Sequence, residues 1–537
     1  RGGSQGLSPT YEQAHVGLDL LTLASHIYME VIFMAKYYLG VDVGTFETKG
    51  VLIDEKFQVV AEMGAKHGME NPKPNYFEQD AEEIWWKDFC IVSKGLIEKA
   101  GIRPEEIAAV GSDVLGCDCL PVDENCHPLR KAILYGIDAR ASEEIAFLNE
   151  HYGEERIKEL FGHPLCSDDI APKILWIKNN EPEVYAKTYK FLTGSSYIAA
   201  KLTGEYVIDQ FLAKASFRPL YNDDAKIDEK ECELFCRPDQ MADAKFVHEL
   251  AGHVTAKAAA ETGLKEGTPV ICGTGDSTSE AISVGITTPG KLMFQFGSSL
   301  FFYYCSDHLT YDHRIHGGDF TVPGTFSVSG GTNTAGTLTR WMRDTLYFDI
   351  LEDQAKSGVE PYQVMMERVA DIPAGSNGLV ILPYFAGERC PINDAQAKGM
   401  IFGLTLEHTR DHIYHAALEG IAYCIAQNIK VMEELNLPVE NLIAVGGGTK
   451  NPVWMQIVAD VIGRPVCIPK VSIGASYGEA LMAALGVGDL KDFGELSSVI
   501  QPDRVILPNE ENTKIYKKYC EIYDKLYTAN KYLMHLL

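Results

Sequence analysis

A glycine-containing turn between two apolar runs, in residues 39–54, constrains this chain more than any other feature. The alternating, partly β-branched runs predict two antiparallel strands, and glycine at position 44 lets the backbone bend between them. Amides and hydroxyls at Gly44, Thr45 and Thr48 can surround an anion, and Asp42 can hold a hydrated magnesium ion. The segment therefore predicts a hairpin that binds phosphate.

A second hairpin of the same kind is predicted over residues 291–304, with Gly297, Ser298 and Ser299 in its turn. Between the hairpins, an apolar strand at residues 270–272 leads through glycines to Asp276, just before a predicted helix. A carboxylate in that position is a candidate general base. A helix N-cap is the alternative, because hydroxyl residues and a glutamate follow it.

A third glycine-rich segment follows the strand predicted at residues 442–445 and precedes a helix predicted over residues 452–461. Gly447 and Gly448 let the backbone approach a flat ligand closely. Asn451 would flank the same ligand, although a turn or a helix cap also explains an asparagine before proline. Together, the glycine-bearing strand ends predict one nucleotide site.

The charge balance excludes some partners. The 537 residues include 48 Lys and Arg against 75 Asp and Glu, which gives a net charge of −27. Such a chain repels nucleic acid and anionic lipid, so its phosphate site needs magnesium and backbone donors. The 13 cysteines are scattered through apolar segments, as is typical of reduced thiols in the cytoplasm, and their short pairs lack the spacing of zinc sites.

Residues 1–35 fit nothing downstream, and we expect them to be a tag or an extra N-terminal segment. The apolar run from residue 16 to residue 33 is interrupted by Asp19, His26 and Glu30, which makes it too polar to span a membrane. It also lacks the combined features of a secretory signal. We place the natural start at Met34, with Met29 as the alternative.

From Lys36 onward, short apolar strands alternate with amphipathic helices, which predicts an α/β architecture. The repeated hairpin predicts two domains, with a boundary at the turn of residues 287–290 and a ligand cleft between them. The last segment, from Asn512 to Leu537, predicts one helix. Its spacing predicts a buried stripe of four side chains: Ile515, Tyr519, Ile522 and Leu526.

These motifs, in this order, resemble the FGGY carbohydrate kinase family from about Lys36 to the C-terminus. The most specific match is residues 399–419, which fit the family's C-terminal signature. Residues 382–399, 75–86 and 132–140 are similar to segments of bacterial xylulose kinases. The N-terminal signature is half kept: Lys173, Trp176, Ile177, Asn179 and Asn180 fit it, whereas Asp168 and Ile170 depart from it.

The resemblance implies two ATPase domains of the actin, Hsp70 and hexokinase type, which is ribonuclease H-like. Residues 36–288 would bind the sugar and carry the base, and residues 289–537 would bind ATP. Asp276 would take a proton from a sugar hydroxyl as it attacks the γ-phosphorus, with Asp42 organising Mg²⁺. The nucleotide would meet Gly44, Thr45, Gly297, Ser298, Ser299, Gly447, Gly448 and Asn451. A cytoplasmic enzyme, acting on a small-molecule sugar as a homodimer, is the further expectation.

The sugar is predicted less sharply than the reaction, because polyol contacts vary within kinase families. We expect Glu78, Gln79 and Asp276 to contact it. Where bacterial xylulose kinases carry a Gln-Met-His-Gly segment, this chain has residues 115–118, and Asp113 and Asp118 are candidate replacements or solvated turn residues. Xylulose is the first candidate, and ribulose or another polyol the alternatives. A non-catalytic ATP-binding sensor on the same fold remains the competing class, with an acetate-type kinase or a hydrolase behind it.

Overall fold

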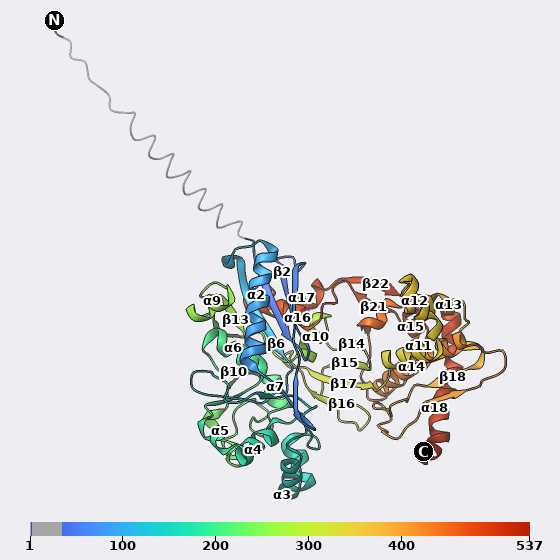
Figure 1. Cartoon of the computed structure of the whole chain (residues 1–537), viewed down its shortest axis with the longest axis horizontal. Coiled ribbons are helices and arrows are strands. Elements are labelled where there is room, and N and C mark those ends of the chain that lie inside the picture. Colours follow the sequence, from blue (N-terminus) through green and yellow to red (C-terminus); the bar gives the residue numbers. More distant parts are fainter. Residues whose placement is uncertain (1, 3–34) are drawn as a thin grey trace.

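The computed structural model describes residue 2 and residues 35–537. The expectation for residues 1–35 therefore falls, apart from residues 2 and 35, outside the described residues. Figure 1 shows two halves, each built around one β-sheet and covered by helices. Within the described part of the chain, no helix is both long and apolar enough to cross a membrane.

The first half contains a six-stranded sheet that includes the first predicted hairpin. In spatial order its strands are β12 (Leu250–His253), β13 (Pro269–Ile271), β6 (Ile107–Val114), β1 (Tyr37–Val43), β2 (Glu47–Asp54) and β3 (Val59–Lys66). Strands β1, β2 and β3 are antiparallel neighbours, whereas β6 lies parallel to both β1 and β13. The hairpin predicted over residues 39–54 is therefore confirmed.

The second half repeats this topology in a seven-stranded sheet. Its strands are β16 (His316–Asp319), β17 (Phe326–Thr332), β15 (Leu300–Ser306), β14 (Lys291–Phe296), β20 (Asn441–Val445), β21 (Val466–Pro469) and β22 (Pro502–Ile506). Antiparallel pairs β14–β15 and β15–β17 correspond to β1–β2 and β2–β3, and the parallel pair β14–β20 corresponds to β1–β6. The second predicted hairpin is thus confirmed as the counterpart of the first.

Helices and smaller sheets complete the first half. Its helices are α2 (Lys87–Ala100), α3 (Ser142–Phe161), α4 (Ile170–Asn180), α5 (Pro182–Lys187), α6 (Gly194–Thr203), α7 (Gln210–Ala215), α8 (Glu229–Phe235), α9 (Ala256–Thr262) and α10 (Asp276–Ser283), with a π-helical turn at Ala81–Trp86. The smaller sheets are β4 (Glu70–Lys73) with β5 (Tyr76–Gln79) and β8 (Ala132–Ile133), β7 (Leu120–Val122) with β9 (Lys190–Leu192), and β10 (Val207–Asp209) with β11 (Asp243–Lys245).

The second half is completed in a similar way. Its helices are α11 (Gly336–Leu346), α12 (Phe348–Ser357), α13 (Pro361–Val369), α14 (Arg410–Glu434), α15 (Pro452–Ile462), α16 (Ala475–Gly486), α17 (Phe493–Val499) and α18 (Glu510–Met534), and β18 (Val380–Leu382) pairs with β19 (Met400–Phe402). The predicted C-terminal helix is confirmed as α18. Its predicted stripe is partly wrong, because Ile515 is 43% exposed and Tyr516 is buried instead.

Helix α16 lies against the sheet of the first half, although it belongs to the second half in sequence (Figure 1). Strand side chains alternate between the two faces of a sheet, so Gly40 on β1 and Gly111 on β6 lie side by side on one face. A Cβ atom at Gly40 would lie 1.9 Å from the carbonyl oxygen of Ser476, and one at Gly111 would lie 2.6 Å from that of Glu479. The two glycines therefore form the flat surface that lets α16 approach.

Helix α10 crosses α16 in the space between the two sheets. At the crossing, a Cβ atom on Gly478 would lie 2.1 Å from the carbonyl oxygen of Ser279. Apolar side chains from both sheets and both helices form one core there, including Tyr38, Ile282, Met293 and Leu481. The two halves thus share a packed core beside the place where the strand ends converge.

Candidate active site

A cavity of about 300 Å³ lies where β1, α10 and the hairpin β14–β15 meet. Asp42 is the penultimate residue of β1, and Asp276 is the first residue of α10. The side chain of Asp276 accepts the N–H of Ser277 at 2.6 Å, while Gly275 occupies the N-cap position. The lining residues are Asp42, Gly44, Asp276, Ser277, Glu280, Met293, Gln295, Phe301 and Ala475. The predicted base and the predicted metal ligand therefore face the same cavity.

The carboxyl group of Asp276 is a weaker acid here than in water. Burial raises its pKa to about 8, and the negative charge of nearby Asp42 adds to the effect. Glu280, one turn along α10, has a pKa raised to about 7 by burial and by Asp42. In the absence of ligands, the negative charges of these carboxyl groups repel one another, which adds to the rise that burial causes in their pKa values. A cation or a ligand hydroxyl in the cavity would reduce this repulsion.

Asp113 lies beside Asp42, because the parallel strands β1 and β6 place these two residues opposite each other. Asp113 is fully buried, and neither of its carboxyl oxygens has a hydrogen-bond donor among the residues that the structure describes. Burial raises its pKa well above the ordinary range, with Asp42 and Glu479 contributing. Burial and the two neighbouring carboxyl groups therefore favour the protonated form of Asp113. It does not line the cavity, and the contact with the sugar that was expected of it stays a prediction.

Asp118 follows β6 in the loop that replaces the expected Gln-Met-His-Gly segment. It is fully buried, and neither carboxyl oxygen bonds to a side chain among the described residues. Burial raises its pKa to about 7, although the positive charge of Lys173 opposes that rise. Asp118 also raises the pKa of Asp276, which shows that the two carboxyl groups lie near each other. An acceptor of this kind suits a ligand hydroxyl.

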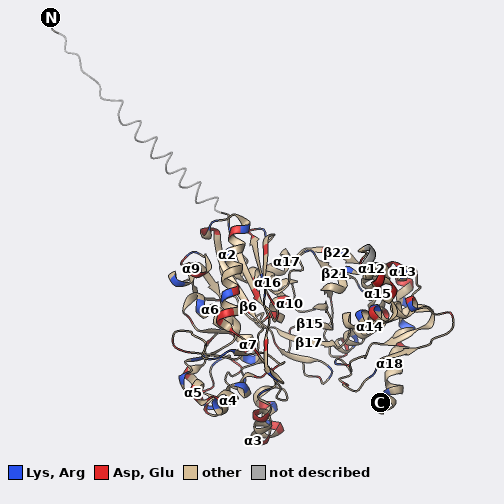
Figure 2. Ribbon diagram, in the orientation of Figure 1, with Lys and Arg blue, Asp and Glu red and all other residues tan. Residues whose placement is uncertain are grey.

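The loop of residues 272–275, which we call the base loop, lies directly before Asp276. Two residues that the sequence analysis missed hold it in place. Glu479 of α16 accepts the N–H of Thr274 at 3.3 Å and the hydroxyl of Ser279 at 2.8 Å. Asp209 of β10 accepts the hydroxyl of Thr274 at 2.5 Å. Figure 2 shows acidic segments in red where α10 and α16 meet. A lone glutamate inside the small, apolar run of residues 475–485 was the available signal, because unpaired charges are seldom buried.

The turn of the first hairpin is held by side chains behind it. The Gln79 amide donates to the carbonyl oxygen of Thr45 at 2.9 Å, and its own oxygen accepts the indole N–H of Trp85 at 2.8 Å. His67 donates to the carbonyl oxygen of Gly44 at 2.8 Å. Gln79 is fully buried and supports the turn, and the contact with the sugar that was expected of it stays a prediction.

Thr48, which we expected beside the anion, is also fully buried. Its hydroxyl donates to Asp88 at 3.2 Å. Thr45 keeps a partly exposed hydroxyl within 3.2 Å of the hydroxyl of Tyr135. Gly44 and Thr45 therefore remain available at the turn, whereas Thr48 belongs to its support.

A second, larger cavity of about 730 Å³ lies beside the turn of the second hairpin. It brings together five of the residues predicted to contact the nucleotide: Gly297, Ser298, Gly447, Gly448 and Asn451. Aromatic and apolar side chains, including Tyr414, Trp454 and Met366, form part of its wall. Consecutive residues Gln295 and Phe296 of β14 line the smaller and the larger cavity respectively. The two cavities are thus adjacent along one strand.

The glycine segment after β20 is shaped by close packing. A Cβ atom on Gly448 would lie 2.8 Å from the Trp454 ring, whereas one on Gly447 would meet nothing within 4 Å. Asn451 accepts the N–H of Trp454 at 3.1 Å, so it caps α15 while also lining the cavity. The alternative interpretation of Asn451 as a helix cap is therefore correct, and it is compatible with a ligand contact.

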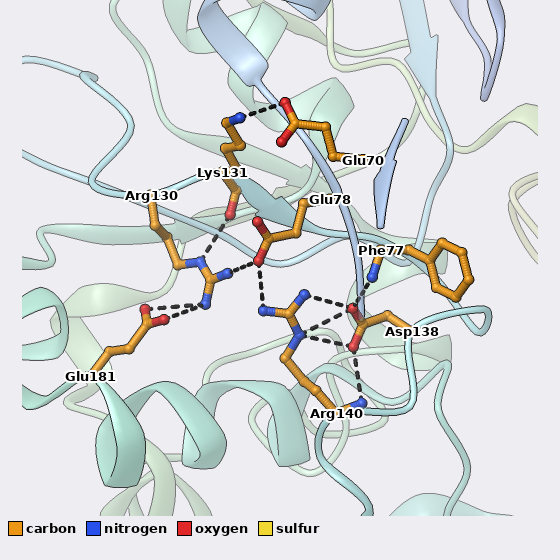
Figure 3. Close-up of polar contacts among 8 residues, drawn as sticks. All are labelled: Glu70, Phe77, Glu78, Arg130, Lys131, Asp138, Arg140 and Glu181. Carbon is orange, nitrogen blue, oxygen red and sulfur yellow. Dashed lines mark hydrogen bonds and ion pairs between the residues drawn. The ribbon is translucent and has the colours of Figure 1, made fainter. Parts of the chain in front are cut away.

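Glu78 belongs to a buried ionic network, which Figure 3 shows in close-up. One oxygen of Glu78 accepts both Arg130 and Arg140, the latter at 2.8 Å. Arg140 also pairs with Asp138 at 2.7 Å, and Arg130 pairs with Glu181 at 3.0 Å. These pairs join β5 to the segment around β8. The structure thus places Glu78 between two guanidinium groups, and neither cavity described above includes it.

Comparisons with known proteins agree with this arrangement. Residues 37–283 match the N-terminal domain, and residues 292–487 the C-terminal domain, of the FGGY family of carbohydrate kinases. A xylulose kinase of Staphylococcus epidermidis is 28% identical over 499 residues, covering 92% of this chain and 97% of that protein. A gluconokinase of Bacillus licheniformis is 27% identical over 498 residues, covering 92% and 96%. The crystal structure of xylulose kinase from Rhodospirillum rubrum has a TM-score of 0.82 at 28% identity, covering 93% of this chain and all of that one. The predicted two-domain kinase fold is confirmed.

Proposed function

Because the chain belongs to the FGGY family of carbohydrate kinases, we propose that it transfers the γ-phosphoryl group of ATP to a hydroxyl of a ketopentose, with xylulose as the first candidate. The observation that carries the proposal is the position of Asp276, at the start of α10 in a cavity between the two hairpins. Phosphoryl transfer leaves little covalent chemistry to the protein. One base in that position, beside a phosphate-binding turn, suffices.

In this mechanism, the ionised carboxylate of Asp276 accepts the proton of the attacking hydroxyl. Its pKa of about 8 makes it a better base than an ordinary aspartate, and proton transfer of this kind is worth about 10²- to 10⁴-fold in rate. The backbone of Gly44 and the turn residues Gly297 and Ser298 would position the phosphates. Burial of the site between the halves would exclude water from the transferred group.

The residues around Asp42 fit a magnesium ion. Oδ1 of Asp42 is buried and receives no N–H or alcohol O–H from the described residues, and the carboxyl groups of Asp276 and Glu280 line the same cavity. Mg²⁺ prefers oxygen ligands and usually keeps several waters. Asp42 would hold such a hydrated ion, which would supply charge neutralisation at the phosphates. The larger cavity would take the adenosine, with its aromatic wall against the base.

The charge around Asp276 favours a neutral sugar over a sugar acid. Asp42, Asp118 and Glu280 all raise the pKa of Asp276, so four carboxyl groups share this region. The carboxylate of a sugar acid would add a further negative charge to this region, and like charges repel one another. Asp118 offers a buried acceptor for a hydroxyl, which a ketopentose supplies.

Ribulose and other neutral polyols are the alternative substrates, since they satisfy the same acceptors. A non-catalytic sensor of ATP or sugar is the competing class, and the raised pKa of Asp276 favours catalysis over it. The expected homodimer stays a prediction.

The test is ADP release from Mg²⁺-ATP with xylulose, ribulose, neutral polyols and gluconate, for the wild type and for Asp276→Asn. We expect turnover on a neutral sugar, at least about a hundredfold loss in the variant, and unchanged ATP binding. ATP binding without turnover on any sugar would favour the sensor. Gluconate as the best substrate would contradict the argument from charge.

A further inference from the structure

The loop between α3 and α4 gathers three side chains of the types that bind transition metals. A ring nitrogen of His163, the sulfur of Cys166 and a carboxylate oxygen of Asp169 all lie within 4.8 Å of one another. In the part of the chain that the structure describes, this is the one such group of three or more His, Cys, Asp or Glu side chains. The group lies where the chain departs from the family's N-terminal signature, beside Asp168.

The hydrogen bonds of His163 leave the metal-binding nitrogen facing Asp169. Its Nδ1 atom lies 2.8 Å from the carbonyl oxygen of Pro164, which can only accept, so Nδ1 carries a proton. Nε2 lies on the other side of the ring, 3.4 Å from Oδ1 of Asp169. A bond from Nδ1–H to a carbonyl is the usual support of a ligating histidine, so Nε2 is the nitrogen that is placed to bind a cation beside Asp169.

The other two side chains are placed to complete the group. Asp169 is 1% exposed in its side chain, and its Oδ2 is fixed by the N–H of Cys166 at 2.8 Å. Cys166 is exposed and the side chain of His163 is 41% exposed, so solvent and ions reach both. Ligands of tetrahedral zinc lie roughly 3.5 Å apart. Because Nε2 of His163 already lies 3.4 Å from Asp169, rotation of the exposed Cys166 side chain can close the remaining gap of about 1 Å.

We propose that His163, Cys166 and Asp169 bind one divalent transition-metal cation of the Zn²⁺ class, with water in the fourth position. Nitrogen, sulfur and oxygen ligands together select such ions over Mg²⁺, which prefers oxygen alone. The site is therefore chemically distinct from the one expected at Asp42.

The position of the loop gives the cation a structural consequence. The hydroxyl of Ser167 donates to the carbonyl oxygen of Gly136 at 2.6 Å, and the N–H of Ile170 donates to that of Ser216 at 2.9 Å. The hydroxyl of Ser216 lies 2.9 Å from the sulfur of Cys117, which precedes Asp118. Through these bonds, a bound cation would stabilise the segment of residues 117–118, which carries Asp118. Only this consequence rests on the proposed function, whereas metal binding itself does not.

The experiment titrates the reduced, chelator-treated full chain with Co²⁺, whose thiolate complexes absorb in the near ultraviolet. We expect a single Co²⁺ per chain with this absorption, which disappears in Cys166→Ser, and binding weakened about tenfold or more in His163→Gln. Zn²⁺ should compete for the site and should raise the unfolding temperature of the wild type but not of Cys166→Ser.

Two matched controls test the assignment. Cys467→Ser removes another partly exposed cysteine, and His308→Gln removes an exposed histidine that pairs with Asp307. Both should bind Co²⁺ like the wild type. The proposal is overturned if the wild type shows no thiolate absorption, if the absorption persists in Cys166→Ser, or if it is lost in Cys467→Ser. These outcomes do not depend on turnover of any sugar.

Discussion

Replacing Glu479 by glutamine should stabilise the protein at high pH and leave its stability nearly unchanged at low pH. Burial raises the pKa of Glu479 from 4.5 to about 8. Between these values, the folded state holds a proton that the unfolded state has released. The free energy of unfolding of the wild type therefore falls as pH rises through this window. Glutamine holds no such proton, so this fall should be missing from the variant.

The change in the free energy of unfolding follows from the shift in the pKa of Glu479. Each pKa unit corresponds to about 1.4 kcal/mol, so at pH 7 the proton uptake of Glu479 costs about 3 kcal/mol. The glutamine oxygen can still accept the N–H of Thr274 and the hydroxyl of Ser279. Its amide nitrogen replaces an oxygen, Oε2, that has no hydrogen-bond partner in the described structure, and we allow about 1 kcal/mol for the mismatch. We therefore expect a net gain of about 2 kcal/mol at pH 7, a larger gain at pH 8, and a loss of no more than about 1 kcal/mol at pH 4.5.

The assay is urea unfolding of the wild type and Glu479→Gln at several pH values, without nucleotide or divalent metal. Glu155→Gln on α3 is the control, because Glu155 is exposed and its replacement should change neither stability nor pH dependence. If the free energies of unfolding of Glu479→Gln and the wild type differ by the same amount at pH 5 and pH 8, the reasoning is refuted. A loss of stability at pH 8 would also refute it.

Three further results are expected. Asp118→Asn should raise the KM for the sugar about tenfold or more while leaving the KM for ATP unchanged, and equal changes in both constants would contradict a sugar contact. With both substrates below saturation, kcat/KM should rise with pH and level off above about pH 8, where Asp276 is ionised, and a flat profile would argue against Asp276 as the base. Gly478→Ala should lower the free energy of unfolding by about 1–3 kcal/mol, because its methyl group meets the carbonyl oxygen of Ser279. Gly68→Ala, where a Cβ meets nothing within 4 Å, should stay near the wild type, and equal losses would contradict the crossing geometry.

Features encoded locally could be predicted from the sequence. Both hairpins, the helix that starts at Asp276 and the glycine segment before α15 follow from alternation, helical spacing and glycine placement. The stripe of α18 could not be predicted fully, because a tertiary bond selects the buried face. The hydroxyl of Tyr516 donates to Glu419 at 2.8 Å inside the core, which leaves Ile515 exposed. The support of the first hairpin by Gln79 could not be predicted either, because it also depends on tertiary hydrogen bonds.

The loop in front of Asp276 shows most clearly what depends on long-range packing. Asp209 holds it from the first half, and Glu479 holds it from α16, 205 residues beyond Thr274 in the sequence. Helix α16 reaches this position only because Gly40 and Gly111 leave room for it. Because α16 packs on β1, β6 and α10 of the first half, Glu479 and the base loop in front of Asp276 belong to the same packed body. We therefore expect closure of the halves to move the second hairpin relative to Asp276 while the bonds of Glu479 stay intact.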